Sequence, residues 1–168
     1  IPNKKISELI AENINIGDIL EKSCKYWDGG YVIGGLLGHG DAFVLRDPSG
    51  IRPAYFYDDD EVVIATSERP CIQTAMNVSK DSIKEIQPGH ALIIKKNGQV
   101  SEVCCKEPLE KKACTFERIY FSRGNDEDIY KERKALGGSL LPAILKEIDN
   151  DIENTVFSYI PNTASAAF

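Results

Sequence analysis

Apolar residues recur at helical spacing near the beginning and near the end of the chain. Ile6, Leu9 and Ile10 would share one face of a helix, and Asn3 before them is a suitable N-cap. Near the other end, a stripe of leucine and isoleucine predicts one long helix that contains Pro142. The predicted helices cover residues 4–13, 18–27, 69–76 and 129–148, and residues 164–168 would open a further helix.

Between these helices the apolar runs become short and are separated by turn residues. Asn97-Gly98 between two such runs is a strong hairpin signal. Residues 31–37 are apolar and rich in glycine, so they predict a strand that is buried on both faces, with the glycines where another layer approaches. The predicted strands cover residues 31–37, 42–45, 54–57, 62–66, 82–86, 91–95, 99–103, 114–121 and 154–160.

The order of these elements predicts an α+β fold in two parts. The strands up to residue 103 form an antiparallel meander after a pair of helices, which is typical of one sheet of a layered sandwich. We expect the second sheet to lie outside this chain, because the strands are too few to cover both sides. Residues 105–113 are charged and contain a proline, which indicates a linker. From residue 114 to residue 168, the order of strand, helix, strand and turn predicts the start of an α/β domain.

Composition limits the classes of function. A chain of 168 residues suits one domain or slightly more, and its 42% hydrophobic and 27% charged content is ordinary for a globular protein. No stretch approaches the roughly 20 apolar residues of a membrane span, and no secretory leader is recognisable. The net charge is −6 and the basic residues do not cluster, so the sequence argues against nucleic-acid binding.

The residue types that often carry chemistry have ordinary structural interpretations here. The 5 cysteines form no C-x-x-C pair, so most are interpreted as small buried residues of a reducing compartment, and at most one of Cys104 and Cys105 would face the core. The acidic triplet at residues 58–60 is predicted to be a solvated loop. His39 and His90 lie beside glycines in predicted turns, and we assign neither a chemical role.

Two runs of residues are more informative than the rest of the chain. The first, at residues 46–53, reads Arg-Asp-Pro-Ser-Gly-Ile-Arg-Pro; its prolines and glycine make a rigid turn, and Asp47 can bond its own backbone two residues on. We expect both arginines to project from this turn, which by itself is equally compatible with a stiff structural hairpin. The second run, at residues 114–123, reads Cys-Thr-Phe-Glu-Arg-Ile-Tyr-Phe-Ser-Arg.

Together the two runs resemble the amidophosphoribosyltransferases, the glutamine-dependent enzymes that open purine synthesis. The first resembles a turn late in their glutaminase domain, and the second resembles the segment at the junction with their phosphoribosyltransferase domain. Tyr130, Arg133 and Gly137 follow at the spacing of that family. The first run also occurs in variants among other class II glutamine amidotransferases, asparagine synthetase included, whereas the second does not.

The resemblance implies a fold and a set of domains. Residues 1–104 would be the C-terminal half of an N-terminal-nucleophile (αββα) glutaminase sandwich, residues 105–113 a linker, and residues 114–168 the beginning of a type I phosphoribosyltransferase α/β domain. The implied reaction makes 5-phosphoribosylamine from glutamine and phosphoribosyl pyrophosphate, with purine nucleotides as inhibitors, in a cytoplasmic homo-oligomer. Nucleic acids and membranes would not be partners.

The resemblance also implies roles for individual residues. Tyr120 would line the path of ammonia between the two sites of the enzyme. Thr163 would approach the magnesium ion of the phosphoribosyl pyrophosphate complex, although a helix N-cap is an equally good interpretation of this residue. Cys114 corresponds to a ligand of the iron–sulfur cluster that some members of the family hold.

The family's N-terminal cysteine nucleophile has no counterpart here, since no cysteine precedes Cys24. We therefore expect an internal piece of a longer enzyme, with no catalytic residue of its own and no activity in isolation. Two alternatives remain open at this point. One is another class II amidotransferase such as asparagine synthetase, and the other is a non-catalytic relative that keeps the sandwich as a regulatory module.

Overall fold

The computed structural model describes residues 2–168 and shows a mixed helix-and-sheet protein that divides into two compact units. The first unit ends at Cys114, and the second comprises Thr115–Phe168. The α+β class predicted from the sequence is therefore confirmed. None of the helices in the described part of the chain is long and apolar enough to cross a membrane.

The first unit contains all the strands of residues 2–168. Its helices are α1 (Asn3–Asn13), α2 (Ile16–Cys24), α3 (Arg69–Met76) and the short 3₁₀ helix η1 (Lys80–Ser82). Its strands are β1 (Val32–Leu36), β2 (Ala42–Arg46), β3 (Tyr55–Asp58), β4 (Val63–Thr66), β5 (Lys84–Glu85), β6 (His90–Ile94) and β7 (Val100–Cys104).

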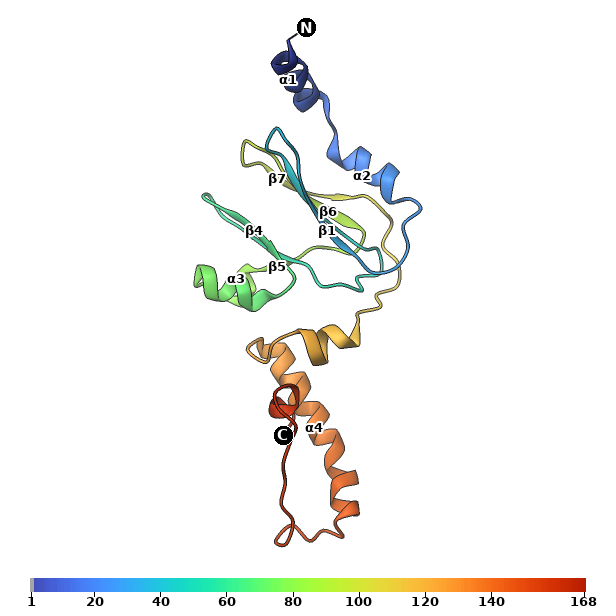
Figure 1. The fold of residues 1–168 in the computed structure, drawn as a ribbon, viewed down its shortest axis with the longest axis vertical. Helices are drawn as coiled ribbons and strands as arrows, with labels where there is room; N and C mark the ends of the chain where they lie inside the picture. Colours follow the sequence, from blue (N-terminus) through green and yellow to red (C-terminus); the bar gives the residue numbers. More distant parts are fainter. Residues whose placement is uncertain (1) are drawn as a thin grey trace. The chain divides into compact units, whose positions relative to one another are not determined.

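These strands form two antiparallel sheets that lie face to face. One sheet has the order β1-β2-β6-β7 and the other the order β4-β3-β5. Helix α2 covers the outer face of the four-stranded sheet, and α3 packs on the three-stranded sheet, so the unit has four layers (Figure 1). The expectation that the second sheet lies outside the chain is wrong, because residues 55–85 supply it.

Two apolar clusters hold these layers together. Between α2 and the four-stranded sheet lie Ile16, Leu20, Cys24, Leu45, Ala91, Ile93 and Cys105. Between the two sheets lie Ala54, Phe56, Ile86 and Leu92. Strand β6 contributes to both clusters, since alternate side chains of a strand point to opposite faces. The strand that is buried on both faces is therefore β6.

Strand β1 was predicted to be buried on both faces, and that prediction is wrong. It lies at an edge of its sheet, with Leu36 80% exposed and Val32 37% exposed. A Cβ atom on Gly35 would lie 2.3 Å from the ring of Phe43, its partner on β2, whereas Gly34 has open space around it. The close approach that the glycines indicated is thus a cross-strand contact at a single position.

The helices at the start of the chain agree with the sequence in number and differ in their ends. The side chain of Asn15 accepts a hydrogen bond from the backbone of Asp18, so α2 begins at Ile16 and includes Gly17, which was expected to precede the helix. Pro2 occupies the N-cap position of α1 that we predicted for Asn3. No residue of α1 is buried, so its apolar stripe is solvent-exposed within the described residues.

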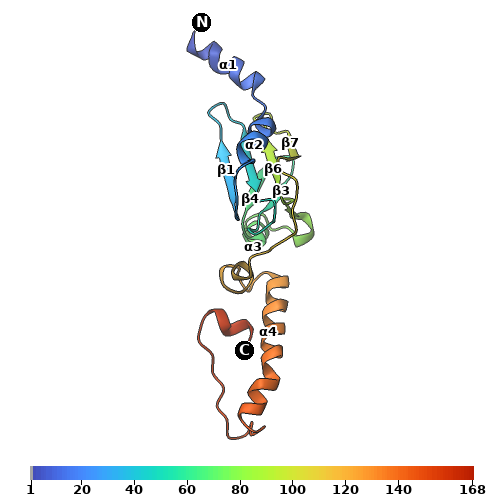
Figure 2. The ribbon, with the colours of Figure 1, turned by 90° about the vertical axis from the view of Figure 1, so that its right-hand side faces the viewer.

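The second unit consists of helical segments and an irregular return (Figure 2). It contains the π-helical turn η2 (Glu117–Phe121), the long helix α4 (Glu127–Glu147) and the 3₁₀ helix η3 (Thr163–Ala166). Helix α4 starts at Asp126, whose carboxylate accepts hydrogen bonds from the backbone of Asp128 and Ile129, and it continues through Pro142. The prediction of one long helix is confirmed.

The two strands predicted in this unit are absent. Residues 117–121 are helical, and residues 154–160 have no regular structure. A strand needs a neighbouring strand for its backbone hydrogen bonds, and the described part of this unit offers none. The α/β character expected for residues 114–168 is therefore not seen among these residues.

Candidate functional site

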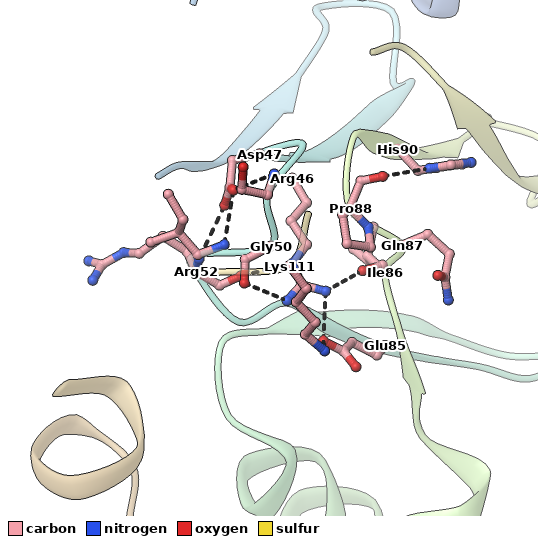
Figure 3. Close-up of polar contacts among 12 residues, drawn as sticks. Arg46, Asp47, Gly50, Arg52, Glu85, Ile86, Gln87, Pro88, His90 and Lys111 are labelled. Atoms are coloured by element: carbon pink, nitrogen blue, oxygen red, sulfur yellow. Dashed lines mark hydrogen bonds and ion pairs between the residues drawn. The ribbon is translucent and has the colours of Figure 1, made fainter. Parts of the chain in front are cut away.

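The turn at residues 46–53 is organised around a buried arginine at the end of β2. Arg46 is 2% exposed. Its Nε donates to the carbonyl of Arg52 at 2.8 Å, and its Nη1 donates to the carbonyl of Ile86 at 2.5 Å. Its Nη2 lies 3.4 Å from the carbonyl of Gly50, and its Nη1 lies 2.7 Å from the carboxylate of Glu85 (Figure 3). The guanidinium thus joins the turn to the three-stranded sheet.

Asp47 fixes the backbone of the same turn from within. It is fully buried, and its Oδ1 accepts from the backbone nitrogens of Ser49 at 3.1 Å and Ile51 at 2.9 Å. Its Oδ2 accepts from the backbone nitrogen of Arg52 at 3.1 Å. Gly50 has φ +58°, a left-handed conformation that a side chain disfavours. The predicted bonding of Asp47 to its own backbone is confirmed.

The electrostatics of this cluster centre on Glu85. Its burial acts to raise the pKa, but the hydrogen bond and charge of Arg46 outweigh burial, and Lys111 adds to their effect, so the pKa lies below its ordinary value. Lys111 Nζ lies 3.4 Å from the same carboxylate. Glu85 is therefore held in its charged form between two cations.

The expectation that both arginines project from the turn is wrong for one of them. Arg46 faces inward, where it satisfies backbone carbonyls, and only Arg52 is exposed, with its side chain directed away from the cluster (Figure 3). The turn consequently connects the two sheets through Arg46 and leaves only Arg52 exposed. No local pattern in the sequence indicates Glu85 as the partner of Arg46.

The second run of residues forms a helical turn in the other unit. The guanidinium of Arg118 forms an ion pair with the carboxylate of Glu132 on α4. Arg133 is 8% exposed, and its Nη2 donates to the carbonyl of Ser122 at 2.5 Å. Arg133 was noticed in the sequence for its spacing alone; the structure shows that it holds η2 and the following residues against α4.

An open pocket of about 680 Å³ lies within this unit and brings together two residues that the sequence singled out. Tyr120 and Thr163 both line this pocket. Helix α4 contributes Arg133 and Leu136 to the same lining. Tyr120 is 62% exposed, and its ring packs edge-on against Phe121. The remaining lining residues are Phe116, Ile119, Ile160, Pro161, Asn162, Ala164 and Ala167.

Gly137 explains how the chain returns to this pocket. A Cβ atom at this position would lie 1.9 Å from the carbonyl oxygen of Ala167. The absence of a side chain therefore lets η3 approach α4, which places Thr163 at the pocket. Arg133 and Gly137, which share a spacing pattern in the sequence, thus contribute to one local packing arrangement.

The described residues do not by themselves fit the metal groups that the resemblance implied. No carboxylate lines the pocket at Thr163, whereas protein magnesium sites are built on one or two carboxylates with waters and substrate phosphates. No group of three or more histidine, cysteine, aspartate or glutamate residues able to hold a metal ion occurs within residues 2–168. An iron–sulfur cluster at the half-buried Cys114 would need three further ligands from elsewhere.

The other residues considered in the sequence have structural roles. His39 Nε2 lies 3.1 Å from a carboxylate oxygen of Asp41, and the Nδ1 of His90 lies 2.9 Å from the carbonyl of Pro88. In the acidic loop, Asp59 accepts hydrogen bonds from the backbone of its own turn, which lower its pKa. His90 and Asp59 thus have hydrogen-bonding partners within the chain.

Comparison with known proteins finds amidophosphoribosyltransferases along nearly the whole chain. The chain is 29% identical over 172 residues to the protein of that name from Saccharomyces cerevisiae, covering 96% of this chain and 33% of the relative. It is 30% identical over 139 residues to that of Escherichia coli, covering 77% of this chain and 26% of the relative. The resemblance to the amidophosphoribosyltransferases is confirmed. The chain spans about a quarter to a third of the length of these relatives.

Solved structures support the same relationship at the level of fold. A glutamine phosphoribosylpyrophosphate amidotransferase from B. subtilis, complexed with ADP and GMP, superposes with a TM-score of 0.66 at 20% identity, over 99% of this chain and 36% of that one. An allosteric regulatory enzyme of purine biosynthesis superposes with a TM-score of 0.70 at 21% identity, over 97% of this chain and 34% of that one. No protein-family model matches the chain.

Proposed function

We propose that the chain is part of an amidophosphoribosyltransferase, which makes 5-phosphoribosylamine from glutamine and phosphoribosyl pyrophosphate in the first step of purine synthesis. The observation that carries this proposal is the similarity over 96% of the chain to a protein of that name, across both units. The run at residues 114–123 favours this family over asparagine synthetase, because it resembles the segment at the junction with the family's phosphoribosyltransferase domain.

The proposed reaction has two half-reactions that exchange ammonia. In the first, a thiolate attacks the amide carbon of glutamine, ammonia leaves, and water releases glutamate from the enzyme. In the second, ammonia attacks C1 of phosphoribosyl pyrophosphate and displaces pyrophosphate. An amine of high pKa is mostly protonated, and therefore not nucleophilic, in water at neutral pH, which favours transfer inside the protein.

We assign the two units to the two half-reactions. Residues 1–104 would belong to the glutaminase domain, and their order of helix, sheet, sheet and helix is the one expected of its N-terminal-nucleophile sandwich. Residues 114–168 would begin the type I phosphoribosyltransferase domain, whose sheet would be supplied by other parts of the protein. No residue of the chain is assigned a catalytic role, so residues 1–168 alone are predicted to be inactive.

Tyr120 and Thr163 are the residues of this chain that we propose to act in transfer and binding. Tyr120 would line the path of ammonia, and Thr163 would contact phosphoribosyl pyrophosphate. The pocket that both residues line supports the two assignments, because it brings them together within the second unit. Arg133 would keep the pocket wall in place by bonding the backbone of Ser122.

Further properties follow from the relatives and stay predictions. Because the B. subtilis structure was obtained with ADP and GMP, we propose that purine nucleotides regulate this protein. Magnesium bound with phosphoribosyl pyrophosphate, an iron–sulfur cluster that includes Cys114, a homo-oligomeric state and a cytoplasmic location are carried over from the family.

The function is tested on the full-length protein that contains this chain. Incubation with glutamine and phosphoribosyl pyrophosphate is expected to produce glutamate and pyrophosphate in equal amounts. Formation of asparagine from aspartate and ATP instead would identify the other class of amidotransferase. The absence of any glutamine hydrolysis would identify a non-catalytic relative.

The role of Tyr120 has its own test in that protein. Tyr120→Ala is expected to lower the amount of pyrophosphate formed per glutamate severalfold, because ammonia would escape from the opened pocket. Tyr26→Ala, which removes a tyrosine that is 84% exposed in the first unit, is the matched control and should leave the ratio unchanged. An unchanged ratio in Tyr120→Ala would remove Tyr120 from the ammonia path.

A further inference from the structure

The segment at residues 106–114, here called the strap, has a linker-like composition but is bound along its length to the first unit. At its start, the backbone nitrogen of Lys106 donates to the carbonyl of Gly89 at 3.0 Å. The Nζ of Lys106 donates to the carbonyls of Trp27 at 2.7 Å and Cys24 at 3.3 Å, at the end of α2. Lys106 thus ties the start of the strap to the last residue of α2 and to the loop that follows it.

The remainder of the strap lies on the turn at residues 46–53. The backbone nitrogen of Leu109 donates to the carbonyl of Pro48 at 2.8 Å, and that of Lys112 donates to the carbonyl of Ser49 at 2.8 Å. The backbone nitrogen of Cys114 donates to the carbonyl of Ile51 at 3.2 Å. The strap is thus bonded to three carbonyls of one turn.

The acceptors of these bonds are themselves held rigidly. Asp47 bonds the backbone nitrogens on the inner side of the turn, which leaves the carbonyls of Pro48, Ser49 and Ile51 available to the strap. At the other anchor, a Cβ atom on Gly89 would lie 2.0 Å from the carbonyl oxygen of Lys106. Only a glycine therefore permits the strap to approach so closely at that point.

The strap ends where the second unit begins. Its last bonded residue is Cys114, and Thr115 is the first residue of the second unit. A free coil of roughly nine residues would have an end-to-end distance of about 15–18 Å and would sample many directions. A bonded strap removes that freedom from the chain that enters the second unit.

We infer that the strap is a positioning segment that couples the two half-reactions, by fixing the point from which the second unit starts. The inference rests on the proposed function. Each free residue in the connection between the two half-reactions adds conformations from which ammonia can escape, and the bonded strap has fewer free residues than a loose linker. The strap therefore acts on the efficiency of transfer and leaves each half-reaction intact.

The first variant releases the strap in the full-length protein. Lys106→Met with Leu109→Pro removes the lysine bonds and one backbone donor. Leu109→Ala with Lys112→Met is the matched control, because it changes two exposed side chains of the strap and keeps every backbone donor. The second variant inserts Gly-Ser-Gly between Cys114 and Thr115, so that the strap bonds remain while the second unit is freed.

Two measurements decide the outcome. Hydrogen exchange of the bonded strap amides, those of residues 106, 109, 112 and 114, is expected to be slow in the unmodified, control and insertion proteins. The amides of residues 112 and 114 are expected to exchange at least tenfold faster in the release variant. The ratio of pyrophosphate to glutamate is expected to be near one in the unmodified and control proteins and at least twofold lower in the other two. Glutamine hydrolysis and synthesis from added ammonium chloride should persist in all four proteins.

Three results would overturn the inference. Strap amides that exchange freely in the unmodified protein would show that the strap is not bound. A pyrophosphate-to-glutamate ratio near one in the insertion protein would show that fixing the start of the second unit is not needed for transfer. The same ratio in a release variant whose strap exchanges fast would show that the bound strap is not needed for transfer. If the unmodified protein hydrolyses no glutamine, the proposed function fails and the coupling role fails with it, while the exchange data still report whether the strap is bound.

Discussion

The Nη1 atom of Arg46 and the Oε1 atom of Glu85 lie 2.7 Å apart and connect the two sheets of the first unit. Arg46 ends β2 in the four-stranded sheet, and Glu85 ends β5 in the three-stranded sheet. Because the guanidinium is buried and also bonds three carbonyls, this pair fixes how the sheets and the intervening turn meet.

Replacement of Arg46 by methionine is expected to destabilise the protein by about 3–5 kcal/mol, because it leaves buried carbonyls without donors and a carboxylate without its main partner. Arg52→Met, at the exposed arginine of the same motif, is the control and should change stability by less than about 1 kcal/mol. Urea unfolding followed by circular dichroism measures both. Equal effects of the two substitutions would show that Arg46 does not hold the turn and the two sheets together.

Gly35 and Gly34 provide a matched pair on the edge strand β1. Gly35→Ala is expected to cost about 1–3 kcal/mol, because its Cβ would lie 2.3 Å from the ring of Phe43. Gly34→Ala meets nothing within 4 Å and should be neutral or stabilising by up to about 1 kcal/mol. Thermal unfolding of the two variants measures the difference. A Gly35→Ala protein as stable as Gly34→Ala would show that the ring does not lie over β1.

Asp41 should make stability depend on pH in the acid range. The hydrogen bond from Lys95 is the largest influence that holds the pKa of Asp41 well below its ordinary value, with Lys96 and His39 adding to it against burial. A depressed pKa gives stability that is present above the unfolded value near about 4 and is lost as the pH falls toward the folded value. Asp41→Asn should therefore reduce the loss of stability between about pH 6 and about pH 2, measured by urea unfolding. The same loss in both proteins would exclude Asp41 as its source.

The five cysteines should differ in reactivity according to burial. Burial raises the pKa of Cys24, and it raises that of Cys105 to about 11, so neither forms the reactive thiolate readily. Cys71 and Cys104 are exposed. At about pH 8, iodoacetamide is expected to label the exposed pair at least tenfold faster than the buried pair, as measured by peptide mass spectrometry. Rapid labelling of Cys105 would show that the contact between α2 and the sheet opens readily.

The sequence predicted those elements whose signals are local. The Asn97-Gly98 hairpin, the helix α3 and the long helix α4 all agree with the structure, because turn chemistry and helical spacing are contained in a few neighbouring residues. The prediction that at most one of Cys104 and Cys105 faces the core is also confirmed, since Cys105 is buried and Cys104 is exposed.

The predictions that failed concern residues whose environment is supplied by distant segments. Arg46 is buried because the carbonyl of Ile86, forty positions away, accepts one of its hydrogen bonds. Residues 117–121 have an aromatic pattern that suits a strand, but they form a helical turn since no strand among the described residues can pair with them. No local pattern in the sequence contains either fact.

The candidate site was likewise only partly predictable from the sequence. The order and spacing of two residue runs indicated the family, and similarity to relatives over nearly the whole chain confirmed that resemblance. The structure alone showed that Tyr120 and Thr163 line one pocket and that the strap is bonded to the turn. Each of these contacts joins segments that are far apart in the sequence.

The amino-acid sequence by itself determined where most helices and hairpins form, which rigid turn follows β2 and which family the chain resembles, because those features depend on backbone preferences and side-chain order within short stretches. Only the tertiary structure decided that two sheets come from this one chain, that Arg46 is internal and that residues 106–114 are held in place. Burial and hydrogen-bond satisfaction depend on the whole packed arrangement. Every residue type has a backbone carbonyl, so the sequence does not show which carbonyl accepts a hydrogen bond from a distant donor.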